Sequence, residues 1–520
     1  MKNILKVKRC LISVSDKTNI TNFAENLTKK KIEIISTGNT YKVLRMNGIS
    51  VKKVSSITGF PEVLDGRVKT LHPKIFGGIL GDTQNSNHKS DMKRYNLKKF
   101  DLVIVNLYPF ETVTNETKNL KKCIENIDIG GPSMIRAAAK NYSSTAIIVD
   151  IKDYEVVLKQ INQYQGISLQ FRKELALKAF TRTMHYDASI TNWIEKRLSI
   201  KNSGDIFIKG NKIANLRYGE NPQQRAAIYS LSQNRDLFYE QLNGKELSYN
   251  NLNDLNLGLK LITEFNNPTC VVVKHSIPSS VSESKSINLA WKKAFSADSL
   301  SAFGGIVVFN KTVDEKLANE LNKVFLELVV APNFSKKAIN IFSKKNSLRV
   351  LKVKNMKALL KNFKRVITML PESILAQDMD NTKINKKSLK VVSKKTPSDT
   401  QIEDLLFACK VVKHVKSNAI VIAKNKTTIG IGSGNTSRVD SVQFAIIKAK
   451  RSFKGKSNLK GAVLASDAFF HFPDSIKLAS KANIASIIQP GGSVNDEKVI
   501  NQADIEKISM AFTGKRSFSH

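Results

Sequence analysis

The chain has 520 residues, a formal net charge of +39 at pH 7 and 41% hydrophobic residues. This length and composition give room for two to four domains with real hydrophobic cores, so we expect a soluble globular protein. No apolar run approaches the roughly 20 residues that span a bilayer, and lysines interrupt the N-terminus too early for a secretory signal. We therefore expect a cytoplasmic protein with no membrane partner.

The positive charge by itself suggests a polyanionic partner such as nucleic acid. Its distribution favours another interpretation, because the lysines are scattered along nearly every segment, with no arginine-rich arm and no aromatic residues interleaved with a basic patch. We expect no nucleic-acid partner. Solvated surface lysines explain the excess, and the positive field can still steer small phosphorylated or polycarboxylate substrates.

The cysteines point to neither a zinc site nor a disulfide framework. They are far apart and show neither C-x-x-C spacing nor nearby histidines. We predict no metal, and we expect Cys10, Cys123, Cys270 and Cys409 to be packed thiols.

The N-terminal segment alternates strand, loop and helix. Residues 10–15 predict a strand, and Ile20, Phe23, Ala24 and Leu27 mark one face of a helix. A second strand at 32–35 runs into a polar loop and another helix. This alternation predicts a parallel sheet with a ligand at the carboxyl ends of the strands. Hydroxyls and amides at helix N-termini suit a phosphate, although the helix dipole supplies only about 0.3–1 kcal/mol, so cations are needed too.

Residues 59–74 form a loop-rich segment that supplies such cations, with Arg67, Lys69 and His72 close together. An arginine can bind a phosphate with two parallel hydrogen bonds; the alternative is that these charges face water. A further buried strand at 101–107 places Asn106 and Tyr108 at its outgoing end.

A helix expected from about residue 127 carries Arg136 and Lys140, and a long helical pattern covers 171–198. The polar stretch after it is the best boundary, so we divide the chain into domains 1–200 and 201–520. In the second domain, buried strands at 269–275 and 327–332 are each joined to polar or small-residue loops. The lysine-rich residues 335–398 look like a solvated connecting region.

Residues 403–441 are the most informative stretch of the second domain. Leu405, Cys409 and Val412 fall at helical spacing, and residues 419–423 predict a buried strand. A short strand and a glycine-spaced loop at 430–434 follow, and the glycines would let backbone N–H groups approach a ligand. Arg438 would then lie within reach of an anion. The alternative is an ordinary tight turn.

The N-terminal motifs S-V-S-D-K-T, S-T-G-N-T, G-R-V-K-T-L-H-P-K, N-L-Y-P-F and I-D-I-G-G-P-S-M-I-R-A-A-A-K-N occur in this order. They resemble the cyclohydrolase domain of the bifunctional purine biosynthesis family, AICAR transformylase/IMP cyclohydrolase. The resemblance implies a methylglyoxal-synthase-like α/β domain with a parallel sheet, which closes the ring of formyl-AICAR to give IMP with loss of water. It assigns nucleotide binding to Ser15, Asp16, Lys17, Thr37, Gly38, Asn39, Thr40, Arg67, Val68, Thr70, Asn106 and Ile129. It makes Lys140 the chief proton-transfer residue, with Lys69, Tyr108 and Asp128 beside it; Asp128 would orient Lys140 or cap the helix that it begins.

The C-terminal motifs L-R-Y-G-E-N-P-Q-Q, V-V-V-K-H, D-S-L-S-A-F-G-G, A-S-D-A-F-F, Q-P-G-G-S and F-T-G-K-R resemble the same family's transformylase domain. The resemblance implies two cytidine-deaminase-like α/β subdomains without their zinc, which transfer formyl from 10-formyltetrahydrofolate to AICAR. It assigns AICAR binding or catalysis to Arg217, Tyr218, Lys274, His275, Gly304, Glu327, Asn418, Arg438 and Arg516. It assigns folate binding to Val439, Asp467, Gln489 and Pro490.

In this interpretation His275 takes the proton of the attacking amine, Lys274 returns one to the departing folate nitrogen, and Asn418 holds His275 or the carboxamide. The family is homodimeric, which implies a homodimer here. The loop after His275 departs from the family pattern at Ile277 and Ser280. A folate- or nucleotide-binding protein that has lost one activity is therefore the rival hypothesis.

Overall fold

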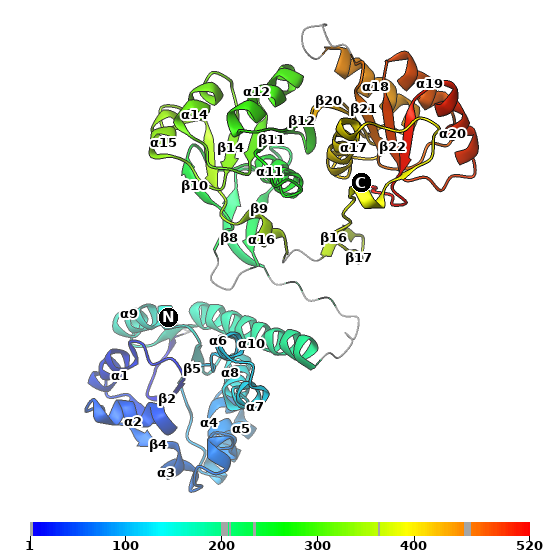
Figure 1. Ribbon diagram of the computed structural model, residues 1–520. Helices are drawn as coiled ribbons and strands as arrows, with labels where there is room; N and C mark the ends of the chain where they lie inside the picture. The colour runs from blue at the N-terminus through cyan, green and yellow to red at the C-terminus, as the bar shows by residue number, and fades with distance from the viewer. Residues whose placement is uncertain are drawn as a thin grey trace. The chain divides into compact units, whose positions relative to one another are not determined.

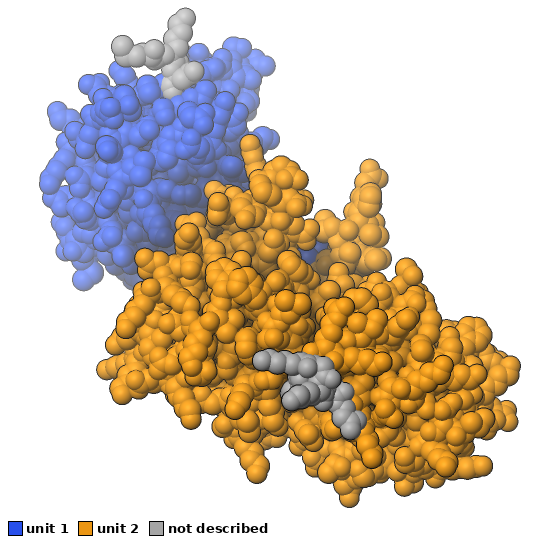
Figure 2. All heavy atoms as spheres, turned by 90° about the horizontal axis from the view of Figure 1, so that it is seen from above, with its two compact units in different colours: residues 1–209 blue, residues 210–520 orange. Residues whose placement is uncertain are grey.

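The computed structural model describes residues 4–198, 206, 208, 210–231, 236–361, 365–451 and 459–520. The chain divides into two compact units, Met1–Lys209 and Gly210–His520 (Figure 2). The boundary predicted near residue 200 lies outside the described residues. Within the part of the chain that the structure describes, no helix is long and apolar enough to cross a membrane.

The first unit is built on a five-stranded parallel sheet with the order β4-β3-β2-β5-β6. A small antiparallel pair, β1 (Ile4–Leu5) with β7 (Ile167–Ser168), lies apart from it. The strands of the sheet are β2 (Arg9–Val14), β3 (Glu33–Ser36), β4 (Lys52–Lys53), β5 (Leu102–Asn106) and β6 (Ala146–Ile148). The helices are α1 (Ile20–Lys29), α2 (Gly38–Met46), α3 (Val54–Thr58), α4 (Pro73–Leu80), α5 (Ser86–Arg94), α6 (Phe110–Glu116), α7 (Leu120–Glu125), α8 (Gly130–Lys140), α9 (Tyr154–Tyr164) and α10 (Leu169–Leu198).

The sequence pattern explains this unit well. Ile20, Phe23, Ala24 and Leu27 are the buried face of α1, as their helical spacing predicted. The residues of β2 and β5 are nearly all buried, because helices cover both faces of a parallel sheet. The predicted parallel sheet is therefore confirmed.

The second unit is built on one continuous twelve-stranded sheet with the order β10-β15-β14-β13-β11-β12-β20-β19-β21-β22-β23-β18. Its first-half strands are β10 (Glu240–Asn243), β11 (Thr269–Lys274), β12 (Ile277–Glu283), β13 (Ile306–Phe309), β14 (Leu328–Ala331) and β15 (Arg349–Lys352). Its second-half strands are β18 (Lys390–Val391), β19 (Ile420–Lys424), β20 (Thr427–Gly432), β21 (Val463–Ser466), β22 (Ser486–Gln489) and β23 (Ser509–Phe512). Two hairpins lie outside the sheet: β8 (Asn211–Leu216) with β9 (Ala226–Ser230), and β16 (Arg365–Leu370) with β17 (Ser373–Asp378).

Helices cover both faces of this sheet (Figure 1). One face packs against α11 (Tyr249–Ile262) and α17 (Asp399–Val412). The other face packs against α12 (Ile287–Ala297), α14 (Glu315–Asn322) and α15 (Lys336–Phe342) in the first half, and α18 (Arg438–Arg451), α19 (Asp474–Lys481) and α20 (Asp496–Ile505) in the second. The short helices α13 (Ser299–Ala302) and α16 (Met356–Lys361) complete the unit.

The two halves repeat one plan. Helix α11 and the hairpin β11–β12 in the first half correspond to α17 and β19–β20 in the second. The helices begin at Ser248 and Ser398, which both cap through a capping box and lie 150 positions apart. Strands β12 and β20 pair antiparallel at Ser282 and Thr427, so the halves are related by a local twofold axis between these strands. The two similar α/β subdomains that we predicted are therefore present.

Two local predictions were wrong. Gly430 and Gly432 lie inside β20, not in a loop, and a Cβ at either would collide with a carbonyl oxygen of α18. These glycines let a helix approach a strand rather than a ligand. Part of the 335–398 segment is also core, because the helix α15 and the strand β15 contribute Phe342, Val350 and Leu351 as fully buried residues. Lysines on the exposed faces of these short elements hide their apolar pattern.

Candidate functional site

In the first unit, a cavity of about 680 Å³ opens at the carboxyl ends of β2, β3 and β5. This is the edge where the alternating pattern predicted a ligand. Of the predicted residues, Ser15, Lys17, Thr37, Asn39, Thr40, Arg67, Lys69, Thr70, Asn106, Tyr108, Asp128 and Ile129 line the cavity. Asp16, Gly38 and Val68 lie next to lining residues in the chain, and Ser13 lines the cavity although the sequence analysis did not select it.

Asn106 holds the first loop in place. Its Oδ1 accepts the backbone N–H groups of Ser15 at 2.6 Å and Asp16 at 3.0 Å. Its Nδ2 donates to the Asp16 carbonyl at 2.8 Å. Thr40 fixes the neighbouring strand end, since its hydroxyl accepts from the Val14 N–H at 3.2 Å and donates to the Val14 carbonyl at 2.9 Å. Hydrogen bonds within the protein therefore hold the polar groups of this edge in place.

Charges of both signs lie in this cavity and next to it. The N–H of Gly38, at the start of α2, donates to Glu62 Oε1 at 3.2 Å. A Cβ at Gly38 would lie 3.5 Å from the Lys69 ammonium, so the lysine borders the same helix N-terminus. Arg67 forms an ion pair with Glu125. Sequence reasoning missed both carboxylates, because nothing in the local pattern shows that they meet these cations. The helix N-terminus already holds an anion, which is what its dipole favours.

Asp128 contacts the first turn of α8, whose N-cap residue is Ile129. Its Oδ1 accepts the N–H of Gly131 at 2.8 Å, a contact that agrees with the capping alternative. Its own N–H donates to the Tyr186 hydroxyl at 2.8 Å. Burial raises the pKa of the Asp128 carboxyl, although the amide hydrogen bonds and the charge of Lys69 oppose the shift. A carboxyl of this kind is suited to exchanging protons with a bound ligand.

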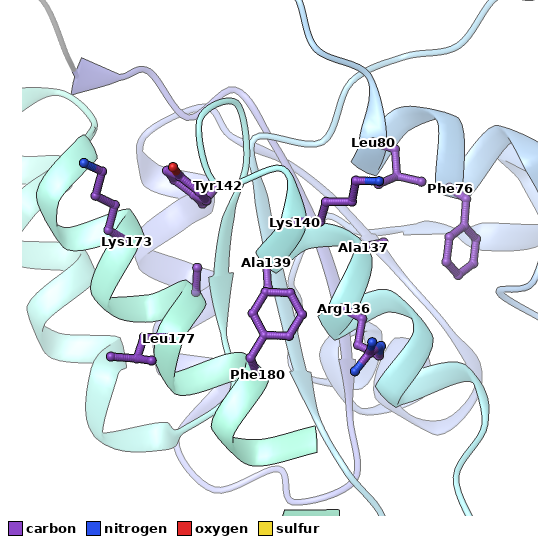
Figure 3. A pocket seen from close by; sticks show the side chains of 11 residues that line it. Phe76, Leu80, Arg136, Ala137, Ala139, Lys140, Tyr142, Lys173, Leu177 and Phe180 are labelled. Carbon is purple, nitrogen blue, oxygen red and sulfur yellow. The ribbon is translucent and has the colours of Figure 1, made fainter. Parts of the chain in front are cut away.

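Lys140 does not line this cavity. It is the last residue of α8, and at about 1.5 Å per residue it lies ~15 Å along the helix from Gly130. It lines a separate groove of about 770 Å³ (Figure 3). The other residues of that groove are Phe76, Leu80, Arg136, Ala137, Ala139, Tyr142, Lys173, Ala176, Leu177 and Phe180.

In the second unit, the sheet register brings the predicted residues to one edge. Lys274 ends β11, whose antiparallel neighbour β13 begins just after Gly304, and Glu327 directly precedes β14. Strands β12 and β20 are antiparallel, so β20 ends at this same edge. Its neighbour β19 therefore begins there, just after Asn418, and β21 ends there, just before Asp467. From β11 to β22 this edge spans five strand spacings, roughly 24 Å. That is room for a two-part ligand.

Lys274 and His275 sit in the first half of this edge. The Lys274 ammonium donates to the Phe303 carbonyl at 2.7 Å, next to Gly304. Glu327 Oε2 accepts from Asn251 Nδ2 at 2.8 Å and lies 3.8 Å from an Arg349 nitrogen. Sequence reasoning missed Asn251 and Arg349, which hold Glu327 in place.

The second half of the edge is a hydrogen-bonded cluster around Arg438. Its guanidinium donates to Asn418 Oδ1 at 2.7 Å and to Ser466 Oγ at 2.9 Å, and it pairs with Asp467. Asp467 is only 1% exposed and also accepts from Ser417 Oγ at 2.5 Å. Asp467 therefore faces Arg438 directly, with its charge balanced inside the protein.

Arg516, Val439, Gln489 and Pro490 lie next to this cluster in the chain or the sheet, whereas Arg217 and Tyr218 lie in a loop beside α11. Ser517 N–H donates to the Asp467 carbonyl at 2.9 Å, which brings the tail carrying Arg516 to this site. Val439 follows Arg438 in α18, the buried Gln489 ends β22, and Pro490 directly follows that strand. The Arg217 guanidinium stacks on the Tyr218 ring at 5.4 Å, in a loop tied to α11 by Asn250, which donates to the Glu220 carbonyl at 3.2 Å.

The loop that departs from the family pattern is a tight hairpin. Lys274 and Ile277 are the last ladder pair, with only His275 and Ser276 between them, and a register shift follows at Val272/Val273. Ser280 Oγ is buried and has no hydrogen-bond partner among the described residues. Lys274 is the last residue of β11, and His275 lies in the turn itself.

The thiols and possible metal ligands add no further site. All four cysteines are buried, as predicted. Burial raises the pKa of the Cys10, Cys270 and Cys409 thiols, the last to about 12. Within the described ranges, no three His, Cys, Asp or Glu side chains form a group that could hold a metal ion.

Comparison with known proteins gives consistent matches along the chain. The family model described as "AICARFT/IMPCHase bienzyme" matches residues 138–448, and an "MGS-like domain" model matches residues 19–133. Proteins named "Bifunctional purine biosynthesis protein PurH" from Thermoanaerobacter sp. (strain X514), Acetivibrio thermocellus and Bacillus subtilis (strain 168) are similar. Their identities are 48%, 45% and 43%, over 99% of this chain and 100% of each relative.

Proposed function

Since the chain belongs to the AICARFT/IMPCHase bienzyme family and is a bifunctional AICAR transformylase and IMP cyclohydrolase of purine biosynthesis, we propose that its two units divide the two reactions. The first unit closes the ring of formyl-AICAR to give IMP, and the second transfers the formyl group from 10-formyltetrahydrofolate to AICAR. The observation that carries this division is the presence of one polar cavity or edge in each unit, built from the residues predicted for that reaction.

In the first unit, the nucleotide lies in the cavity with its phosphate at the loops of β2 and β3. The hydroxyls and amides of Ser15, Thr37 and Thr40 and the cations Lys17 and Arg67 suit an oxygen-rich anion. An incoming phosphate would compete with Glu62 for the N-terminus of α2 and with Glu125 for Arg67. Both carboxylates are surface groups that can move aside.

Ring closure follows from the groups at the other end of the cavity. The carboxamide nitrogen of formyl-AICAR attacks the formyl carbon, and negative charge develops on the formyl oxygen before it leaves as water. The Lys69 ammonium and the Tyr108 hydroxyl can stabilise this charge. Asp128, with its raised pKa, can take a proton from the attacking carboxamide nitrogen and pass one to the formyl oxygen. The second proton of the departing water comes from the formamide nitrogen as the ring C=N bond forms. Lys140 keeps its role as a prediction from the family resemblance, to be tested by the rate of this step.

In the second unit, the AICAR amine attacks the formyl carbon of the folate. His275 removes a proton from the amine, and Lys274 gives a proton to the folate nitrogen as its bond to carbon breaks. AICAR contacts the first half of the edge and Arg438, and the folate extends toward Asp467, Gln489 and Pro490. The roughly 24 Å length of this edge suits two ligands placed side by side.

The test is to mix the purified protein with AICAR and 10-formyltetrahydrofolate and to follow free tetrahydrofolate and IMP separately. We expect the wild type to form both. His275→Ala should form neither from these substrates but should still convert added formyl-AICAR to IMP. A wild-type protein that cyclises formyl-AICAR yet never releases tetrahydrofolate would contradict the assignment of the second unit.

We also propose that the protein works as a cytoplasmic homodimer, as the family resemblance implies. Sedimentation of the full chain over a range of concentrations tests the dimer. A monomer that retains both activities at micromolar concentration would contradict it.

A further inference from the structure

The turn that carries His275 has an unusual backbone. His275 and Ser276 have φ values of 55° and 56°, so both lie in the left-handed region. They are the two central residues of the hairpin between β11 and β12, where left-handed residues match the twist of the strands. Neither is a glycine, and this conformation is unfavourable for residues with a Cβ. Interactions elsewhere must hold the turn in this shape.

Asp254, on the inner side of α11, supplies these interactions. Its Oδ1 accepts the Ser276 N–H at 2.5 Å and lies 3.4 Å from the Ser276 hydroxyl. Burial raises the pKa of this carboxyl, and the neighbouring His275 N–H acts in the opposite direction and lowers it. The carboxylate therefore holds the turn by its hydrogen bond from the Ser276 N–H, which fixes the backbone directly after His275.

The second half of the unit contains the same device without a predicted catalytic residue. Asp404 of α17 accepts the Asn425 N–H at 2.8 Å and the Lys426 N–H at 2.7 Å. Asn425 and Lys426 have φ values of 52° and 53°. Asp254 and Asp404 each lie six residues after the serine that caps their helix. The Asp404 turn joins β19 to β20 at the opposite edge of the sheet from Asn418 and Arg438.

Comparison of the two halves distinguishes holding the hairpin turn from positioning a histidine. Holding a left-handed hairpin turn is common to Asp254 and Asp404, so it is a requirement of the fold. Only the Asp254 turn carries a histidine at the edge where the predicted transformylase residues gather. We propose that Asp254 is a positioning residue for His275 in formyl transfer. This inference rests on the proposed function of the second unit.

The physical reason is preorganisation. A general base must lie within hydrogen-bond reach of the proton that it removes. His275 is exposed, so the packing of its own side chain does not fix its direction. The clamped turn fixes the direction of its Cα–Cβ bond, and small misplacements of catalytic groups can reduce a rate about 10²-fold.

The experiment compares Asp254→Asn and Asp254→Ala with the matched variants Asp404→Asn and Asp404→Ala in the full-length protein. Hydrogen exchange of peptides covering residues 270–280 and 420–430 reports whether each turn has loosened. We expect each alanine variant to accelerate exchange in its own turn and to lower Tm by a similar amount. Only the Asp254 variants should lower kcat for formyl transfer, by 10- to 100-fold for alanine and less for asparagine, which keeps one acceptor. KM for AICAR should stay within threefold, and cyclisation of added formyl-AICAR should be unchanged.

The outcomes that overturn the inference are specific. If Asp404→Ala lowers formyl transfer as much as Asp254→Ala, the effect is a general loss of fold. If the Asp254 turn exchanges faster while kcat stays within twofold of the wild type, the clamp does not position the base. If the alanine variants do not fold, the asparagine pair decides by the same comparison. A wild-type protein that releases no tetrahydrofolate would instead overturn the proposed function, and the positioning role with it.

Discussion

Glu264 and His414 occupy equivalent positions at the ends of α11 and α17, 150 residues apart, and their Oε1 and Nε2 atoms meet at 3.1 Å. Lys413 also reaches Glu264, at 3.2 Å. In a pair of identical halves, two like side chains would face each other here. In this protein a carboxylate faces an imidazole and an ammonium instead. The contact therefore favours packing of the first half against the second half over packing of either half against a second copy of itself. On the other face of the sheet, Asp298 and Lys448, also 150 positions apart, lie 3.8 Å from each other.

The Glu264 contact predicts a pH-dependent stability. Burial alone would raise the pKa of Glu264, but the hydrogen bond to His414 and the charges of His414 and Lys413 outweigh it and lower the pKa. A carboxylate with a lowered folded pKa stabilises above its unfolded pKa, about 4.3, and this contribution is lost as the pH falls through the folded pKa. We expect Glu264→Gln to lower the free energy of unfolding by about 1.5–3 kcal/mol at pH 7, with the difference shrinking below about pH 4.

Urea unfolding at pH 7 and at pH 3.5 measures this difference. Glu320→Gln is the control, because Glu320 pairs with Lys323 on the surface and should change stability by less than about 1 kcal/mol. If Glu264→Gln lowers the free energy of unfolding equally at both pH values, the charge of Glu264 does not contribute to this contact.

Lys69 and Lys140 should affect cyclisation differently. Lys69 lines the nucleotide cavity, whereas Lys140 lies in a separate groove. We expect Lys69→Met to weaken IMP binding and to slow ring closure by at least about 10²-fold. Lys140→Met should slow ring closure and leave IMP affinity unchanged. Calorimetric IMP titration and the rate from added formyl-AICAR make the measurement. If Lys140→Met cyclises at the wild-type rate, the role taken from the family resemblance does not apply to this chain.

Arg438→Lys should impair formyl transfer selectively. The guanidinium contacts Asn418, Ser466 and Asp467 at once, and an ammonium cannot reproduce that planar set of donors. We expect kcat/KM for formyl transfer to fall more than tenfold while cyclisation is unchanged, measured with AICAR and formyl-AICAR in separate assays. Arg451→Lys, at the far end of α18, is the matched control and should have little effect. Equal activity of both variants would remove Arg438 from the site.

Substitution of Gly432 and of Gly434 by alanine should destabilise the protein for different reasons. A Cβ at Gly432 would collide with the Ser441 carbonyl of α18, whereas Gly434 has open space and a φ of 70°. We expect Gly432→Ala to cost about 3 kcal/mol or more through overpacking and Gly434→Ala about 1–2 kcal/mol through backbone strain. Denaturant unfolding ranks the two. A Gly432→Ala protein of normal stability with a raised KM would restore the idea of a ligand-binding glycine loop.

Ser280 and Ser282 lie two residues apart in β12, and we expect their substitution by alanine to have opposite effects on stability. Ser280 Oγ is buried with no partner among the described residues, so Ser280→Ala should raise stability by up to about 1 kcal/mol. Ser282 Oγ lies 2.9 Å from Thr427 Oγ1 at the junction of the two halves, so Ser282→Ala should lower stability by about 1 kcal/mol. Thermal unfolding of both variants tests the contrast. A loss at Ser280 as large as that at Ser282 would mean that its hydroxyl is satisfied.

Local pattern was sufficient for several features of this protein. The buried face of α1 follows from the spacing of Ile20, Phe23, Ala24 and Leu27, because a helix repeats every 3.6 residues. The parallel sheet of the first unit and the meeting of its polar loops follow from the alternation of strand and helix. These are short-range consequences of periodicity, and the motifs that resemble a known family are likewise short and contiguous.

Tertiary structure decided the rest, because it depends on which segments meet. The spacing of Gly430 and Gly432 predicts a ligand-binding loop, but in the structure α18 packs directly against both glycines. Lys140 and Asp128 are close in sequence, yet a rigid helix holds them at its two ends. Asp254 looks like any polar residue on a helix, and only the hairpin 22 residues later shows what it binds. The sequence alone determined the repeating local elements and the chemistry they carry. Only the sheet register, which pairs strands across the two halves, determined that these groups share one edge, because strand pairing joins residues that no local pattern connects.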